Sequence, residues 1–258
     1  MMISEFSRIE SVVEVGENIF TLTFTSPMIS KSILPGQFVN IKGSQYTDPL
    51  LRRPFSIYLL EQERLSIIFN VIGKATALFQ HMKAGEFLDV LGPLGVHYNY
   101  DSPDFDTAVL MAGGLGIAPF GILTSFLKHS RKTIVTLLGA QTSRRVVKDH
   151  LEAVRVSTDD GSSGMRGTVV DLARKAFQTT QLTRPKIFAC GPNKMLQATA
   201  RLADEFAIPC ELSMEGPMAC GFGICQGCPV EVVGRERKYS LMCKDGPVFD
   251  SQSIRFQN

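Results

Sequence analysis

The hydrophobic pattern divides the chain into regions of different rhythm. Up to about residue 100, short runs of β-branched and aromatic residues are separated by turn residues, which predicts strands. The expected strands are Ile19 to Phe24, Gln37 to Ile41, Phe55 to Leu60 and Leu65 to Val71. One helix is expected from Thr76 to Met82, and the LGPLG sequence of Leu91 to Gly95 predicts a rigid loop. We therefore expect a small antiparallel β-barrel over residues 1–100.

From residue 101 to 210, strand-like and helix-like runs alternate. The expected strands are Thr107 to Met111, Thr133 to Ala140, Val154 to Thr158 and Lys186 to Ala189. Helices are expected after Gly116, over Val169 to Phe177 and over Asn193 to Phe206. This alternation predicts an α/β domain whose parallel sheet is covered by helices on both faces.

Residues 211–258 contain few helix formers and are too few to bury a large core. They include Cys220, Cys225, Cys228 and Cys243, which are spaced C-x4-C-x2-C-x14-C. Three thiols in one loop and a distant fourth are the plant-type arrangement for a two-iron two-sulfur (2Fe-2S) cluster. Metal binding can supply the folding free energy that such a segment lacks. The multi-module fold is thus expected to end in a small 2Fe-2S module.

Zinc and disulfides are the alternatives for these cysteines. Structural zinc sites usually pair two separate cysteine knuckles, whereas three of the thiols here share one loop. A chain of 258 residues with 6 cysteines is unlike the small secreted domains that depend on disulfides. Cys210, at the edge of the last module, is expected to be an ordinary buried thiol.

Composition excludes some partners. Hydrophobic residues make up 44% of the chain, and 27 Lys and Arg nearly balance 25 Asp and Glu, without blocks of like charge. Neither nucleic acid nor a membrane surface is therefore expected as a partner. The uncharged run from Thr107 to Leu127 contains several glycines and a proline, which favours a strand, a turn and a helix over a membrane span. The N-terminus lacks the pattern of a signal peptide, so we expect a cytoplasmic protein.

Two motifs in the first region have the chemistry of a flavin site. Arg53, Pro54, Phe55 and Ser56 lead into a strand, where the guanidinium could bind a pyrophosphate and the hydroxyl could contact a flavin ring nitrogen. The alternative is a surface arginine pair beside a half-buried strand. The sequence from Gly73 to Thr76 precedes the helix, where it could receive a phosphate or simply cap the helix.

Two further motifs come directly after predicted strands of the α/β region. Gly113, Gly114 and Gly116 lie between a strand and a helix, as a dinucleotide phosphate loop does, although the sequence is not G-x-G-x-x-G. Close packing is the alternative. Cys190, Gly191 and Pro192 end the fourth strand at its carboxyl end, where ligands of open α/β sheets collect. For Cys190 the alternative is a small buried hydrophobic side chain.

The choice between NAD and NADP stays open at this point. Arg144 and Arg145 come after the second parallel strand, where they could recognise a 2′-phosphate or be solvated charges. The acidic loop from Asp159 to Gly164 is most simply a solvated connection, with ribose contact as the alternative. The four histidines lack any spacing typical of a metal site.

Taken in order, the RPFS motif, the GGLGIAP loop, the CGP corner and the C-terminal cysteines resemble the ferredoxin-reductase-like family. The segment from Glu215 to Phe249 resembles, within it, the electron-transfer subunits of dihydroorotate dehydrogenase B. The resemblance covers almost the whole chain. It implies that the four cysteines ligate the cluster and that NAD uses the second domain. It also implies FAD in the barrel, at the matching positions Arg53, Pro54, Phe55, Ser56, Asn70, Val71, Ile72, Ala75 and Thr76.

The same resemblance implies a partner. A separate FMN-containing catalytic subunit would oxidise dihydroorotate to orotate in pyrimidine biosynthesis, in a heterotetramer of two copies of each subunit. Electrons would then travel from dihydroorotate to the partner's flavin, the cluster, FAD and NAD. A flavin is needed because NAD exchanges two electrons as hydride and a cluster passes one at a time. This chain would be the relay.

The sequence departs from the family at two points. Ala75 stands where the family usually has glycine in a G-x-G-T turn, which would change how the backbone approaches FAD. The C-x14-C interval is shorter than in free plant-type ferredoxins and argues against an autonomous ferredoxin domain. Two other functions are open: a subunit of another flavin and iron-sulfur complex (sulfide, sulfite or hydrogenase type), and a redox sensor without flavin.

Overall fold

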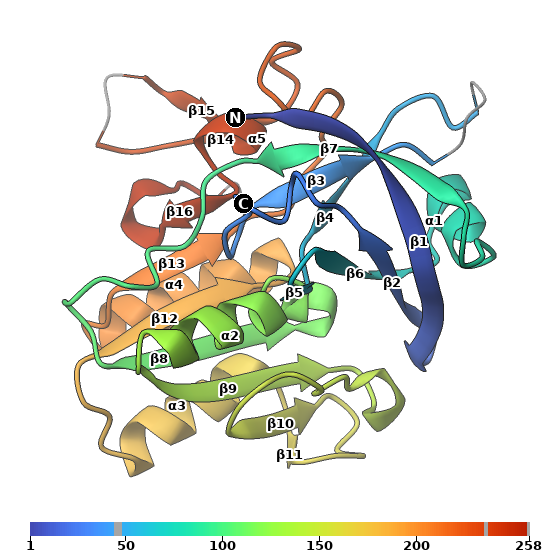
Figure 1. Cartoon of the computed structure of the whole chain (residues 1–258). Coiled ribbons are helices and arrows are strands. Elements are labelled where there is room, and N and C mark those ends of the chain that lie inside the picture. The colour runs from blue at the N-terminus through green and yellow to red at the C-terminus, as the bar shows by residue number, and fades with distance from the viewer. Residues whose placement is uncertain (44–47, 235–236, 257–258) are drawn as a thin grey trace.

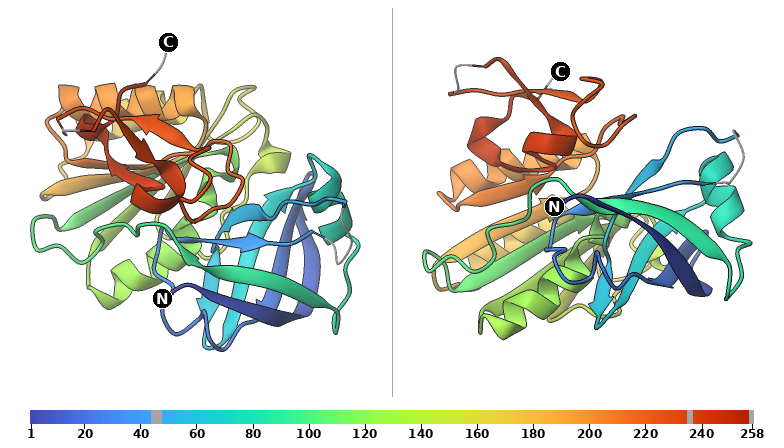
Figure 2. Two further views of the ribbon diagram at one scale, coloured as in Figure 1. Left: turned by 90° about the horizontal axis from the view of Figure 1, so that it is seen from above. Right: turned by 45° about the horizontal axis from the view of Figure 1, so that its top comes forward.

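The computed structural model describes residues 1–43, 48–234 and 237–256. In this part of the chain the strands form two seven-stranded sheets and one two-stranded sheet (Figure 1). Figure 2 shows the C-terminal segment lying against the α/β layer and the N-terminal sheet curling beside them. No helix among the described residues has the length and apolar character needed to cross a membrane.

The first sheet is antiparallel throughout, with strand order β4-β3-β7-β1-β2-β6-β5. Its strands are β1 (Ile3–Gly16), β2 (Ile19–Thr25), β3 (Phe38–Ile41), β4 (Arg53–Ser56), β5 (Leu59–Glu61), β6 (Arg64–Asn70) and β7 (Phe87–Leu94). Its concave side encloses a core that includes Leu22, Phe69 and Phe79. The expected antiparallel barrel is confirmed as a partly open one.

Three expectations for this region were wrong in detail. The run from Phe55 to Leu60 is two strands, β4 and β5, separated where Tyr58 turns inward and its hydroxyl donates to the Asp149 carbonyl over 2.6 Å. The expected loop from Leu91 to Gly95 lies largely in β7, because residues there alternate between partly buried and buried and pair with both β1 and β3. The expected helix from Thr76 to Met82 is α1 (Lys74–Phe79).

The second sheet has the order β11-β10-β9-β8-β12-β13-β16. Its parallel strands are β8 (Thr107–Gly113), β9 (Thr133–Ala140), β10 (Val154–Thr158), β11 (Met165–Arg166), β12 (Pro185–Cys190) and β13 (Cys210–Ser213). The last strand, β16 (Val248–Asp250), is antiparallel to β13. The four strands expected in this region are all present, because continuous apolar runs are typical of buried parallel strands.

Helices cover both faces of this sheet, as the alternation predicted (Figure 1). Helix α2 (Phe120–His129) shares a core with Ala108, Leu110 and Ala112 of β8. Helices α3 (Val169–Thr179) and α4 (Asn193–Glu205) share the opposite core with Val109 and Met111. Consecutive residues of β8 therefore face opposite helical layers, which explains its unbroken hydrophobic sequence.

The C-terminal segment adds little regular structure of its own. Strands β14 (Pro229–Glu231) and β15 (Tyr239–Leu241) form the two-stranded sheet, followed by α5 (Met242–Asp245). Cys228, Met242 and Cys243 belong to the same core as α3 and α4. The segment is thus anchored on the α/β layer. The domain boundaries at residues 100 and 210 stay predictions.

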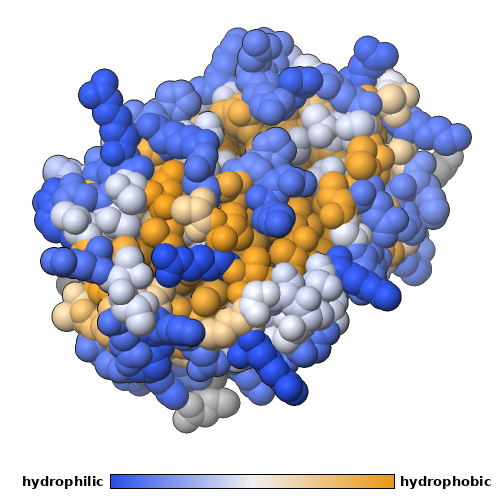
Figure 3. All heavy atoms as spheres, turned by 90° about the horizontal axis from the view of Figure 1, so that it is seen from below, coloured by the Kyte–Doolittle hydropathy of each residue, from blue (hydrophilic) through white to orange (hydrophobic). Residues whose placement is uncertain are grey.

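On the face of the molecule shown in Figure 3, apolar residues gather in the middle and hydrophilic residues surround them.

Candidate functional site

A pocket of about 630 Å³ lies between the first sheet and the carboxyl edge of the parallel sheet. That volume is typical of a site for a cofactor or other small molecule. Nine of the expected cofactor residues line it: Arg53, Pro54, Phe55, Ser56, Asn70, Ile72, Ala75, Thr76 and Cys190. Its far wall is formed by Ser213 to Gly216 and Met218 of the C-terminal segment. Residues far apart in sequence therefore enclose one site.

The two neighbouring arginines have different roles in the structure. Arg52 is bound to β7, where Nη2 lies 2.7 Å from an Asp89 carboxylate oxygen and Nη1 donates to the Asp89 carbonyl. Arg53 lines the pocket, and its Nη1 donates to the backbone carbonyls of Leu51 and Arg52 over 2.7 and 3.2 Å. Arg53 has no carboxylate partner among the described residues. Its guanidinium charge is therefore available to an anionic ligand.

The rest of the RPFS motif is held by the barrel core. Phe55 contacts Phe69 and Phe79, with ring centroids 6.3 and 5.6 Å apart. This packing fixes β4 and the Ser56 hydroxyl that follows it in the pocket wall.

The turn before α1 is largely self-satisfied. The Thr76 hydroxyl accepts hydrogen bonds from the N–H groups of Ile72 and Gly73, 3.0 and 3.2 Å away, so the turn is capped internally. Val71 does not line the pocket, and its carbonyl accepts a hydrogen bond from Asn18. A Cβ on Gly43 would lie 3.0 Å from the Ala75 methyl group. The absence of a side chain at Gly43 thus accommodates alanine in place of the family's usual glycine.

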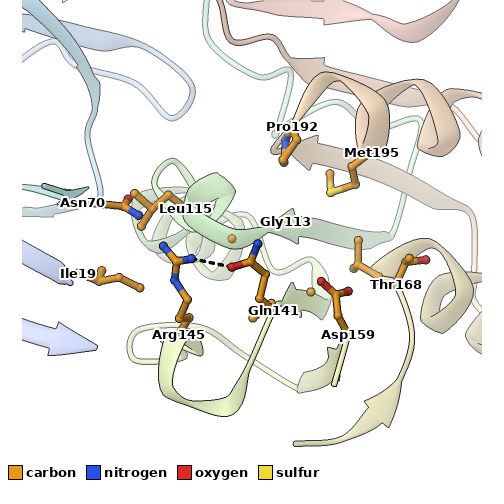
Figure 4. A pocket seen from close by; sticks show the side chains of 14 residues that line it. Ile19, Asn70, Gly113, Leu115, Gln141, Arg145, Asp159, Thr168, Pro192 and Met195 are labelled. Carbon is orange, nitrogen blue, oxygen red and sulfur yellow. Dashed lines mark hydrogen bonds between the residues drawn. The ribbon is translucent and has the colours of Figure 1, made fainter. Parts of the chain in front are cut away.

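A second pocket, of about 320 Å³, lies at the carboxyl ends of the parallel strands (Figure 4). Gly113, Gly114 and Pro192 line it, as expected. Gly116 and Gly191 do not line it. A Cβ on Gly116 would approach the Cys190 carbonyl oxygen to 1.9 Å, so this glycine serves close packing of the turn after β8 against the end of β12. Close packing is thus the role of Gly116, and binding of a dinucleotide phosphate by Gly113 and Gly114 stays a prediction.

Charged and polar residues from the next three strand ends complete the second pocket. Gln141 and Arg145 come after β9, Asp159 comes after β10, and Thr168 comes after β11. The Arg145 guanidinium donates to Gln141 Oε1 over 2.8 Å, and Asp159 lies on the opposite side of Gln141 (Figure 4). Arg144 points elsewhere, is 79% exposed and approaches Glu17. Gln141 and Thr168 were not among the expected site residues, whereas Arg145 and Asp159 were considered for contact with a 2′-phosphate and a ribose, because they follow parallel strands that end at one edge.

The two pockets are continuous, because Asn70 and Leu115 line both of them. A dinucleotide bound at the strand ends can therefore place one end against a ring system held in the larger pocket.

The four C-terminal cysteines fall into two pairs along the chain. Cys220 is half-buried and Cys225 is exposed on the loop, whereas the Cys228 and Cys243 sulfurs are buried and 3.2 Å apart. Two ligands per iron are what a 2Fe-2S cluster requires, whereas zinc needs all four around one point. The donor set therefore fits the two-iron cluster better than zinc.

The two pairs differ in electrostatics. Burial acts to raise the pKa of Cys220, but the backbone N–H groups of Cys225, Phe222 and Ile224 outweigh it and lower the pKa to about 6. Burial, together with Cys228, raises the pKa of Cys243 to about 12. Bound iron would supply the positive charge that favours the Cys243 thiolate. The loop around Cys220 already directs N–H groups toward sulfur, as a cluster site must.

The other two cysteines are not part of this group. Burial and the nearby Glu215 raise the pKa of Cys190, and burial raises that of Cys210, in both cases far above the usual thiol range. Cys210 is 3% exposed and part of the core, as expected. Both side chains are therefore neutral thiols.

The chain is similar to known proteins over most of its length. Residues 215–255 match the family described as the iron-sulfur cluster binding domain of dihydroorotate dehydrogenase B. The chain is 37% identical over 248 residues to the dihydroorotate dehydrogenase B (NAD(+)) electron transfer subunit of Geobacillus kaustophilus, covering 93% of this chain and 94% of that protein. The chain belongs to this family. The subunit of Desulforamulus reducens is 33% identical, with 96% and 97% covered.

Solved structures also resemble this member of the dihydroorotate dehydrogenase B electron transfer family. An NADH-dependent reduced ferredoxin-NADP oxidoreductase, studied for flavin-based electron bifurcation, aligns with a TM-score of 0.86 and 29% identity over 97% of this chain and 90% of that chain. A ferredoxin NADP+ reductase from Neisseria gonorrhoeae with bound FAD and NADP aligns with a TM-score of 0.68 and 18% identity, covering 79% and 91%. The second likeness shows that the fold is shared.

Proposed function

We propose that this chain relays electrons between NAD and a partner subunit that oxidises dihydroorotate, using FAD in the larger pocket and a 2Fe-2S cluster on the four cysteines. The observation that carries the proposal is the order of the sites. The larger pocket shares Asn70 and Leu115 with the nucleotide pocket on one side, and its wall from Ser213 to Met218 runs directly into Cys220 on the other. A flavin held there lies between the other two redox groups.

The flavin pocket supplies charge and shape. The Arg53 guanidinium compensates a pyrophosphate, and the Ser56 hydroxyl and Asn70 offer hydrogen bonds to a polar ring edge. When bound, FAD converts hydride transfer into single-electron transfer. The chain itself positions the reactants, and Leu115 and Ala118 exclude water from the contact between nicotinamide and flavin.

The nucleotide pocket favours NAD over NADP. The Asp159 carboxylate is suited to bind a ribose diol and would repel a 2′-phosphate. The Arg145 guanidinium, which could attract a 2′-phosphate, is hydrogen-bonded to Gln141. We expect Asp159→Asn to reduce the preference for NADH over NADPH about tenfold by removing that repulsion. Steady-state rates with both nucleotides test this. Asp160→Asn is the matched control, because Asp160 does not line the pocket.

The partner is proposed to dock at the cluster loop. Phe222 and Ile224 are 41% and 75% exposed beside the exposed Cys225. Their apolar surface suits a protein partner, and its position beside a cluster ligand gives electrons a short path. The proposed complex contains an FMN-bearing catalytic subunit and two copies of each chain, in the cytoplasm.

The test is anaerobic mixing of the purified holoprotein with its catalytic subunit, followed by EPR of the cluster. Dihydroorotate should reduce the cluster only when the catalytic subunit is present, and Ile224→Asp should slow this without changing reduction by NADH. Absence of cluster reduction in the reconstituted complex would reject the proposal.

A second candidate is a subunit of an electron-bifurcating complex, favoured by the 0.86 TM-score to the NADH-dependent ferredoxin-NADP oxidoreductase. The same complex, supplied with NADH, NADP and ferredoxin in place of dihydroorotate, decides between the two candidates.

A further inference from the structure

Asn40 joins the first sheet to the cluster loop. It lies on β3, is 1% exposed, and its Nδ2 donates over 2.9 Å to the carbonyl oxygen of Cys220, which is 180 positions further along the chain. On either side of it, Val39 and Ile41 belong to the barrel core. Alternation along a strand therefore directs Asn40 out of that core and toward the C-terminal segment.

The cluster loop is shaped to receive this side chain. Gly221, next to the ligand Cys220, has φ +81 and carries no Cβ, and a Cβ there would lie 2.0 Å from Asn40 Nδ2. Glycine is thus required both by conformation and by the close approach of the Asn40 amide.

The amide group is otherwise unfavourable in this position. Its Oδ1 is buried and accepts no hydrogen bond from the described residues. A buried acceptor without a donor costs free energy, which an apolar side chain of similar size would avoid. The hydrogen bond to Cys220 is the one interaction in the described structure that explains an amide here.

We propose that Asn40 is a positioning residue that fixes the first cluster ligand relative to the flavin. Asn40 is paired in register with Pro54 of the RPFS motif, so one strand position connects the proposed flavin-binding strand to the ligand loop. Through it, the barrel sets the separation of flavin and cluster and supports the N–H groups that surround Cys220 sulfur. This inference rests on the proposed function only in assigning FAD and the cluster to their sites.

The test compares holoprotein variants Asn40→Ala and Asn40→Asp with Ser7→Ala. Ser7 is a matched control, because it is 0% exposed on β1 and its hydroxyl is also unpartnered among the described residues. Asn40→Ala should raise the rate of cluster bleaching by a chelator about tenfold, and Asn40→Asp should raise it further because its carboxylate opposes the Cys220 carbonyl. Both should alter the EPR line shape of the dithionite-reduced cluster, while Ser7→Ala leaves it unchanged.

A double-mutant cycle makes the assignment specific. Gly221→Ala should cost less cluster stability in the Asn40→Ala background than in the wild type, because the collision with the amide is gone. The inference would be overturned if Asn40→Ala showed the bleaching rate and EPR line shape of the wild type, or if the effects of the two substitutions on cluster stability were additive. If Asn40→Asp fails to fold, the result for Asn40→Ala decides. Dithionite reduction needs no partner, so failure of dihydroorotate to reduce the cluster would reject the proposed function and leave this result intact.

Discussion

The flavin pocket and the cluster loop are built in opposite ways. The flavin side rests on β4, which is hydrogen-bonded to β3 and packed through Phe55 on Phe69 and Phe79. The loop from residue 214 to 228 contains neither helix nor strand and uses left-handed glycines at Gly221 and Gly223. Burial of apolar surface forms the first site in advance, whereas the second depends on its ligands and on a few contacts such as Asn40.

The variant with the largest expected effect should lose the cluster and keep the flavin. Cys228→Ser should reduce bound iron to less than about a tenth of the wild-type content, because one of the buried pair of thiolates is lost. Bound FAD should remain, since its pocket is formed by the sheets. Iron and flavin assays measure both, with Cys210→Ala as the control outside the site. Full iron content in Cys228→Ser would contradict the proposed ligand set.

A second variant tests the close packing of the glycine turn after β8. Gly116→Ala places a Cβ 1.9 Å from the Cys190 carbonyl oxygen, a backbone clash that should lower the free energy of unfolding by about 3 kcal/mol. Gly114→Ala is the matched control, because Gly114 has open space around it and only a positive φ. It should cost about 1 kcal/mol. Urea unfolding distinguishes them, and equal effects would show that packing at Gly116 is unimportant.

The adjacent arginines provide a third comparison. Arg53→Lys should weaken FAD binding about tenfold, because lysine cannot make the bidentate contact of a guanidinium. Arg52→Lys should leave FAD affinity unchanged, since Arg52 is bound to Asp89. Fluorescence titration of the apoprotein measures both affinities. An equal loss in the two variants would remove Arg53 from the pyrophosphate site.

The smallest effect is a pH dependence outside the flavin pocket and the cluster loop. The side chain and backbone N–H of Thr168 hydrogen-bond to Asp171 at the start of α3 and lower the pKa of its carboxyl below the usual 3.8. A lowered folded-state pKa stabilises the protein above the unfolded pKa, and this contribution is lost as the pH falls through the folded value. Asp171→Asn should therefore cost about 0.5 kcal/mol at neutral pH and progressively less below about pH 4. A difference that persists at low pH in acid unfolding would contradict this origin.

Elements set by hydrophobic periodicity and by fixed motif spacing could be predicted from the sequence. The exposed, alternating β1 and the strand β7 through Gly92 and Pro93 were missed, because sheet pairing there overrides local turn signals. Gly113, Gly114 and the RPFS motif lie in the expected pockets, since local sequence determines a strand end. Asp159 lies in the nucleotide pocket, where its position after a parallel strand had left ribose contact open as an alternative. The contact of Asn40 with Cys220 depends on tertiary structure and leaves no signal in a single sequence.

The most direct test of the account is EPR and visible spectroscopy of the anaerobically purified chain after addition of NADH alone. We expect bound FAD, a 2Fe-2S cluster, bleaching of the flavin absorbance and the EPR signal of a reduced two-iron cluster. A protein that contains zinc, or a cluster that stays oxidised while the flavin is fully reduced, would contradict the claim that the four cysteines hold an iron centre in electronic contact with the flavin.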